Sequence, residues 1–152
     1  RRTLGRAARA GSRSGKGGPG SVTLELINPD GLHTPESYTQ GAVATGSRLV
    51  FVADQAADDA EGNLVGHGDL ATQAREAFAN VGRALAATGA RPEDVARITI
   101  YVMHHRPEYL PVISEARNAV FGAHKPTDTL LGVETLAEPG YLIEIDAIAV
   151  VD

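Results

Sequence analysis

The 152-residue sequence contains no cysteine and no tryptophan, and it has only one methionine. The lack of cysteine excludes disulfides, thiolate nucleophiles, cysteine-based zinc sites and iron–sulfur clusters. No stretch approaches the roughly 18 consecutive apolar residues that a membrane-spanning helix needs, so we expect a soluble protein with no membrane partner. The nucleophile elbow, the H-E-x-x-H zinc motif and the dinucleotide-binding glycine fingerprint are also missing.

Acidic residues are missing from residues 1–21, which hold six of the 14 Lys and Arg residues. This segment is rich in Gly, Ser and Arg, and it has too few apolar residues to offset the entropy of ordering, so we predict a disordered basic tail. Three origins fit it: an expression scar, a native tail or an organelle transit peptide. We expect a cytoplasmic protein, with organelle targeting by this tail as the alternative.

Residues 22–152 are predicted to form a single acidic domain, because 43% hydrophobic residues suffice for one core. They hold 8 basic residues against 19 acidic ones, a net charge of −11 (8 − 19). This charge disfavours a nucleic-acid partner. The two adjacent histidines, His104 and His105, would point in opposite directions on an extended segment, so we predict no metal site.

Apolar periodicity predicts an α+β domain with six strands and two helices. The strands are expected over 21–29, 38–46, 48–55, 98–103, 127–136 and 141–150, and the helices over 69–88 and about 108–121. Two helices can shield only one face of the resulting mixed sheet. The last strand is apolar on both faces, so we expect oligomerisation through the uncovered sheet face and sites between subunits.

The last predicted strand carries two carboxylates among apolar residues. At the strand period of two, Glu144 and Asp146 share a face with Leu142, Ile148 and Val150. Either both acids face bulk water at a sheet edge, or one lies in a cleft at a subunit boundary. In such a cleft, partial removal from water raises the proton affinity of a carboxylate, which can then hold or activate a water molecule. Periodicity alone leaves both alternatives open.

Three segments resemble the RidA/YjgF family, also called endoribonuclease L-PSP. They are "PESYTQGAVATGSRLVFVADQ", "GDLATQAREAFANVGRALAATGARPEDVARITIYV" and "KPTDTLLGVETL…LIEIDAIAV", in this order from about Asn28 to Val150. The resemblance implies a chorismate-mutase-like fold and a homotrimer with clefts between its subunits. It also implies hydrolysis of reactive enamines and imines to a keto acid and ammonia, with no cofactor and no metal.

The resemblance also implies roles for particular residues. In the family, a Glu on the last strand positions the attacking water, an Arg binds the substrate carboxylate, and a Tyr and a Ser line the pocket. Matched by motif, the Glu falls on Glu144, with Asp146 as a companion acid, and the Tyr falls on Tyr38. The Arg position is Asp128 and the Ser position is Ala53, so the donors that would bind a 2-imino acid are absent.

We therefore expect a RidA-like hydrolase or deaminase of a small imine or enamine with a substrate range altered from 2-imino acids, in which Asp128 binds an amino or ammonium group. The alternatives are a non-catalytic protein that binds a small molecule, and an Asp128 that points into solvent. Tyr101 either packs in the core or binds substrate. An arginine from a neighbouring chain, such as Arg48 or Arg106, would restore binding of 2-imino acids. Ribonuclease activity is disfavoured, because the domain is acidic and no His or Lys cluster could perform phosphoryl chemistry.

Overall fold

The computed structural model describes residues 22–152, and the predicted basic tail lies outside the described residues. All the strands and helices predicted from the sequence are present, in the predicted order. They are β1 (Thr23–Ile27), β2 (Gly41–Thr45), β3 (Arg48–Gln55), α1 (Leu70–Ala87), β4 (Val95–Met103), α2 (Leu110–Phe121), β5 (Thr127–Val133) and β6 (Ile143–Val151). Short 3-10 helices at Pro92–Asp94 and Pro107–Tyr109 precede β4 and α2.

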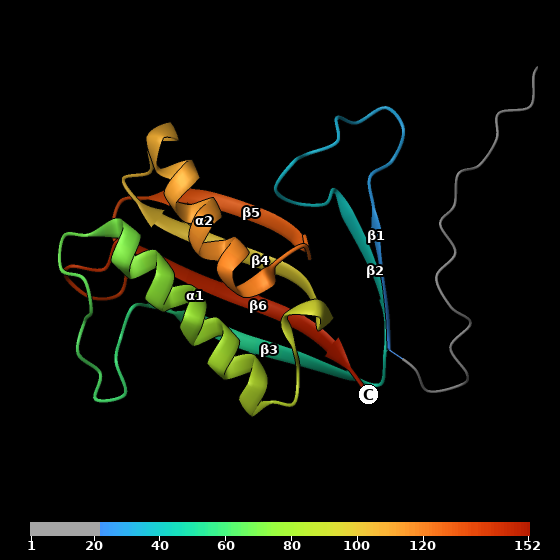
Figure 1. Ribbon diagram of the computed structural model, residues 1–152, viewed down its shortest axis with the longest axis horizontal. Coiled ribbons are helices and arrows are strands. Elements are labelled where there is room, and N and C mark those ends of the chain that lie inside the picture. Colours follow the sequence, from blue (N-terminus) through green and yellow to red (C-terminus); the bar gives the residue numbers. More distant parts are fainter. Residues whose placement is uncertain (1–21) are drawn as a thin grey trace, which may run out of the picture.

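The strands form two separate sheets (Figure 1). The larger sheet has the order β3-β6-β4-β5, in which β6 is antiparallel to both of its neighbours and β5 is parallel to β4. A parallel pair needs a crossover, and α2 supplies it. The smaller sheet is an antiparallel pair of β1 and β2. The prediction of a mixed sheet in an α+β domain is therefore confirmed.

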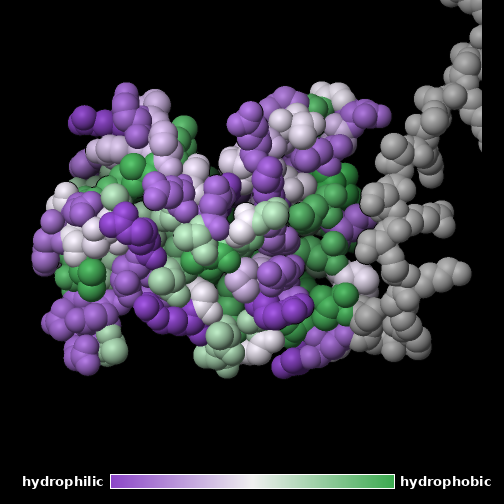
Figure 2. Space-filling view, in the orientation of Figure 1, coloured by the Kyte–Doolittle hydropathy of each residue, from purple (hydrophilic) through white to green (hydrophobic). Residues whose placement is uncertain are grey.

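Both helices cover one face of the four-stranded sheet, as predicted (Figure 1). The Asp69 side chain caps α1, because its Oδ1 accepts a hydrogen bond from the Thr72 N–H at 3.2 Å. The apolar stripe of α1 is fully buried against the sheet, and it consists of Ala74, Ala77, Phe78, Val81 and Leu85. Hydrophilic residues predominate on the helix side in Figure 2, with hydrophobic residues gathered beside the β1–β2 pair.

The opposite face of the four-stranded sheet, here called the open face, leaves large apolar side chains in solvent. Leu49 and Phe51 of β3 are 63% and 70% exposed, and Leu131 of β5 is 45% exposed. Apolar side chains on a sheet face that no helix covers are typical of a surface that contacts another molecule. Within residues 22–152, neither helix combines the length and apolar character that crossing a membrane would require.

Candidate functional site

Glu144 lies on the open face but is largely removed from water. The side chains of Ile143, Ile145 and Ala147 on β6 point to the helices and are at most 1% exposed. Glu144 points the other way, opposite Tyr101 of β4 in the strand register, and it is only 7% exposed. A solvated carboxylate at a sheet edge therefore does not describe Glu144.

The Glu144 side chain lines a pocket of about 460 Å³ where β3 ends and β6 begins, here called the acidic pocket. The remaining lining residues are Ala53, Asp54, Gln55, Ala56, Asp58, Asp59, Asn80, Ala137 and Tyr141. The Ala137 N–H donates to Glu144 Oε1 at 3.3 Å. Four of the lining residues are acidic, and none of the residues that line it is a Lys, Arg or His. This pocket favours cationic ligands over anionic ones.

The acidic loop that follows β3 shapes one side of the acidic pocket. The Tyr141 hydroxyl donates to Asp58 Oδ2 at 2.5 Å, and this hydrogen bond raises the pKa of Tyr141 to about 12. The other oxygen of this carboxylate, Asp58 Oδ1, is buried without a hydrogen-bond partner. The Asn80 amide of α1 donates to the carbonyls of Ala56 and Asp58, at 2.9 Å in both cases, and so fixes the loop.

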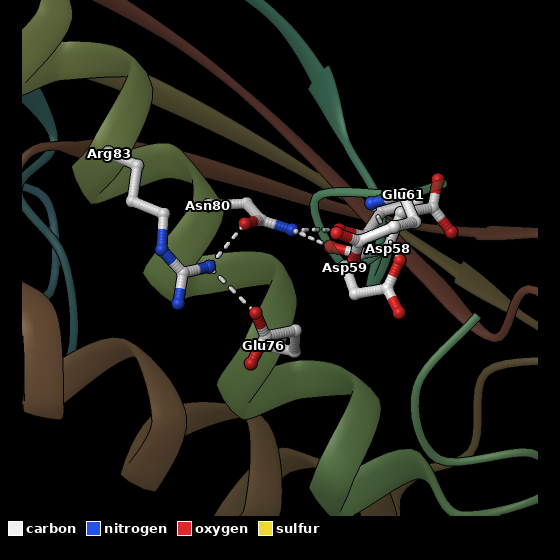
Figure 3. Close-up of polar contacts among 7 residues, drawn as sticks. Asp58, Asp59, Glu61, Glu76, Asn80 and Arg83 are labelled. Carbon is white, nitrogen blue, oxygen red and sulfur yellow. Dashed lines mark hydrogen bonds and ion pairs between the residues drawn. The ribbon is translucent and has the colours of Figure 1, made fainter. Parts of the chain in front are cut away.

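The sequence did not predict a functional role for these loop residues, because residues 56–67 have only the pattern of a polar loop. The available signal was the run of acidic residues directly after an apolar strand, close to the predicted position Ala53. Arg83 is the nearby cation, but Figure 3 shows its guanidinium turned along α1 toward Glu76 and Asn80, with Asn80 between it and the loop acids.

Tyr101 and Asp146 form a separate polar pair on the open face. The Tyr101 hydroxyl donates to Asp146 Oδ2 at 3.0 Å, and this hydrogen bond raises the pKa of Tyr101. Tyr101 is half-buried beside Glu144 and does not belong to the core cluster. The core alternative for Tyr101 is therefore wrong, although the residue does not line the acidic pocket.

Tyr38 and Asp128 line a second pocket, on the helix side of the sheet. It has a volume of about 230 Å³ and is here called the arginine pocket, with Ser37, Tyr38, Ile100, Leu110, Ile113, Ser114, Arg117, Asp128 and Leu130 as its lining. Asp128 pairs with Ile98 in the β4–β5 register and thus faces the helices, whereas Glu144 faces away from them. Within one chain, the structure does not bring Asp128 and Glu144 together.

Arg117 of α2 is the functional candidate that the sequence reasoning missed. It is 3% exposed, and its Nη1 lies 3.5 Å from Asp128 Oδ2. Burial raises the pKa of Asp128 and lowers that of Arg117, while the attraction between the two groups opposes both shifts. The Asp128 side chain is only 11% exposed, so the alternative in which it points into solvent is wrong.

The signal for Arg117 was its place on the buried stripe of the second helix, four residues after Ile113. Arg48 and Arg106, the arginines suggested by the sequence, are both exposed. Arg48 donates to the C-terminal Asp152 carbonyl. Arg117 thus supplies a guanidinium to the pocket from within the same chain.

The Tyr38 loop is tied to the segment between α2 and β5. The Thr39 hydroxyl donates to the Lys125 carbonyl at 2.6 Å, and the Thr39 N–H donates to the Pro126 carbonyl at 3.3 Å. Arg117 Nη1 donates to the Ser37 carbonyl. These bonds flank Tyr38 on both sides and hold it in the lining of the arginine pocket.

No group of three or more His, Asp or Glu side chains among residues 22–152 is arranged to hold a metal ion. The polar side chains that line the two pockets are carboxylates, hydroxyls, two amides and the Arg117 guanidinium. A buried carboxylate beside a pocket can accept a proton from water, and the surrounding acids can stabilise a positive charge.

Comparisons with known proteins agree on one family. Residues 30–151 match the family model "Endoribonuclease L-PSP". A RutC family protein of Pyrococcus abyssi is 30% identical over 128 residues, which is 84% of this chain and 98% of the relative. The crystal structure of YyfB from Yersinia pestis, of the conserved Rid family, has a TM-score of 0.79 and 34% identity, covering 84% of this chain and 98% of the other. A YjgF family structure from Mycobacterium tuberculosis has a TM-score of 0.56 and 25% identity, covering 84% and 99%.

Proposed function

Since this chain belongs to the endoribonuclease L-PSP family, which includes RidA and YjgF, we propose that it hydrolyses small imines or enamines. We propose that its substrate range differs from the 2-imino acids. The observation that carries this proposal is the Glu144 carboxylate, which is only 7% exposed and lines a pocket. No Lys, Arg or His side chain lines this pocket. A carboxylate in that setting can hold and activate a water molecule.

The proposed reaction needs only this acid and water. Glu144 accepts a proton as the water oxygen attacks the carbon of the protonated C=N bond, which gives a neutral carbinolamine. The proton then passes from Glu144 to the nitrogen, the C–N bond breaks, and Glu144 takes up the hydroxyl proton as the carbonyl forms and ammonia leaves. Tyr38 is proposed to line the same site and to hydrogen-bond the substrate.

We place the complete site between two protomers of a chorismate-mutase-like homotrimer. The acidic pocket holds Glu144 and Ala53, whereas the arginine pocket holds Tyr38 and Asp128 on the other side of the sheet. Neither pocket alone holds all four residues that match the family's site. The apolar side chains of the open face are proposed to form the contact between protomers.

The altered range follows from the polar groups of the two pockets. Asp128 stands where the family has an arginine that binds the substrate carboxylate, and Ala53 offers no hydroxyl. Asp54 adds a further negative charge next to Ala53. A substrate carboxylate would meet acids in both pockets, so we expect weak binding of 2-imino acids.

The first experiment generates imines with an amino-acid oxidase from acidic, neutral and basic amino acids and follows ammonia release. We expect acceleration for at least one of them, and Glu144→Gln is expected to reduce it by about 10²- to 10⁴-fold, the usual contribution of a general base. Glu115→Gln, on the exposed face of α2, is the matched control and is expected to retain the activity. Activity of Glu144→Gln equal to that of the control would remove Glu144 from the mechanism.

The second experiment tests the shared site by mixing two inactive variants, Glu144→Gln and Tyr38→Ala. If each site takes one pocket from each of two protomers, random trimers regain about a quarter of the wild-type sites after unfolding and refolding together. If each site lies within one chain, the mixture stays inactive, and the proposal of a shared site fails.

A non-catalytic ligand-binding protein is the second candidate. It is favoured by Ala53 and Asp128, which replace two polar groups of the family's site. No acceleration with any imine, together with a rise in melting temperature caused by a small metabolite, would support this candidate over the hydrolase.

A further inference from the structure

The guanidinium of the arginine pocket is already neutralised within the chain. Arg117 lies 3.5 Å from the Asp128 carboxylate, and the two side chains are 4% and 11% exposed. Arg117 also donates to the Ser37 carbonyl and, at 3.1 Å, to Asn118 Oδ1. A ligand carboxylate that binds Arg117 would also meet the Asp128 carboxylate, which lines the same pocket. The pocket therefore offers an anion no net attraction.

The charge of the acidic pocket is not neutralised in this way. Asp54, Asp58, Asp59 and Glu144 all line it. On α1, the Arg83 guanidinium forms an ion pair with Glu76, with 2.7 Å between Nη1 and Oε1. Asn80 lies between this guanidinium and the loop acids (Figure 3). The charged side chains that line this pocket are all acidic, so they attract a positive charge that develops on a ligand.

Apart from Tyr38 and two serines, the rest of the arginine pocket is apolar. Ile100, Leu110, Ile113 and Leu130 form most of its wall, and the pocket volume is about 230 Å³. A short hydrocarbon tail fits such a wall, and each buried methylene contributes about 0.8 kcal/mol to binding.

Resting on the proposed function, we infer that the substrate is an imine derived from a primary amine, with a short apolar tail and no carboxylate. Its iminium form would lie in the acidic pocket beside Glu144, and its tail would lie in the arginine pocket. The reaction is R–CH=NH₂⁺ + H₂O → R–CHO + NH₄⁺, so atoms and charge balance without an oxidant. An amine-oxidising reaction must supply this substrate.

A matched pair of imines tests the inference. L-amino-acid oxidase acting on leucine gives a 2-imino acid, and a flavin amine oxidase acting on 3-methylbutylamine gives the imine with the same side chain and no carboxylate. Ammonia release follows the hydrolysis of each imine, and the same oxidase reaction without the protein gives the uncatalysed rate. We expect kcat/KM at least about tenfold higher for the amine-derived imine.

The outcomes separate the two proposals. Faster hydrolysis of the leucine-derived imine would overturn the substrate class while leaving the hydrolase in place. If the protein accelerates the hydrolysis of neither imine, both the proposed hydrolase and the proposed substrate class are wrong. The wild-type protein gives an independent measurement by calorimetry, in which 3-methylbutylammonium is expected to bind at least about tenfold more tightly than 4-methyl-2-oxopentanoate. Equal or reversed affinities would contradict the charge argument.

The Asp128→Asn variant tests the neutralising pair itself. Without its counter-charge, Arg117 becomes available to a carboxylate, so the preference for the amine-derived imine is expected to fall at least about tenfold. Glu115→Gln, exposed on α2 and outside both pockets, is the control and is expected to keep the wild-type preference. An unchanged preference in Asp128→Asn would show that the pair does not set specificity.

Discussion

The pair of Arg117 and Asp128 allows a quantitative prediction about stability. Their charges lie 3.5 Å apart, which corresponds to about 5 kcal/mol of attraction at an effective dielectric constant of about 20. Burial opposes this attraction, as the raised pKa of Asp128 and the lowered pKa of Arg117 show. Removing one partner leaves an uncompensated buried charge, which typically costs about 3–5 kcal/mol.

A double-mutant cycle measures the coupling between the two side chains. We expect Arg117→Met and Asp128→Leu each to lower the free energy of unfolding by about 3–5 kcal/mol, and the double variant to lie within about 1 kcal/mol of the wild type, because well-packed apolar residues often replace a buried ion pair without loss. Urea unfolding followed by circular dichroism gives these values, at pH 7 and one fixed protein concentration, since association shifts apparent stability.

A surface ion pair is the control for this cycle. Arg83 and Glu76 lie only 2.7 Å apart, but their side chains are 63% and 27% exposed. Their coupling energy is expected to stay below about 1 kcal/mol, because water screens exposed charges. If the buried pair shows no larger coupling than this surface pair, burial does not govern the energetics of the arginine pocket, and the argument that Asp128 neutralises Arg117 fails.

Three further predictions concern the fold, one phenol and the open face. Gly66 has a φ of 79°, and a Cβ there would lie 2.7 Å from Thr72 Cγ2, whereas a Cβ at Gly68, with a φ of 70°, would meet no atom within 4 Å. Gly66→Ala should therefore lower the free energy of unfolding by at least about 1 kcal/mol more than Gly68→Ala. Equal losses of stability in urea unfolding would contradict this. Tyr141 should ionise at about pH 12. Because its folded pKa is raised, its hydrogen bond stabilises the fold fully below the unfolded pKa of about 10 and ceases to do so as the pH rises through about 12; a titration at 295 nm that is unchanged in Tyr141→Phe would refute the assignment. Phe51→Glu should convert an oligomer to monomers in light scattering while the fold persists, since Phe51 is 70% exposed in the single chain; a monomeric wild type, or an unchanged assembly in the variant, would exclude the open face as the contact.

The sequence predicted the secondary structure well because its periodicities are strong. The buried stripe of α1, from Ala74 to Leu85, follows the helical period, and Asp69 caps the helix as its position indicates. The alternation along β6 correctly separated Glu144 from Ile143 and Ile145. Both signals are local, so one sequence suffices to detect them.

The candidate site was harder to predict because it depends on strand register and on ion pairing. Alternation within one strand does not tell which face of the sheet a residue on another strand shares. Asp128 and Glu144 lie on opposite faces because Asp128 aligns with Ile98 and Glu144 with Tyr101, three residues further along β4. The pairing of Arg117 with Asp128, eleven positions apart on a helix and a strand, leaves no periodic signal.

Arg117 also shows why residue type alone does not decide what a pocket binds. A guanidinium lines the arginine pocket, as a site for carboxylates would require, but it comes from α2 and has its own carboxylate 3.5 Å away. The electrostatic effect on a ligand is that of the two charges together, because both side chains are nearly excluded from water and solvent does not screen one charge alone. An Arg at this position therefore favours 2-imino acids only if Asp128 is neutral, and with Asp128 charged the acids around Glu144 dominate the field. In the proposed shared site, the identity of the substrate would thus depend on the charge balance of both pockets together.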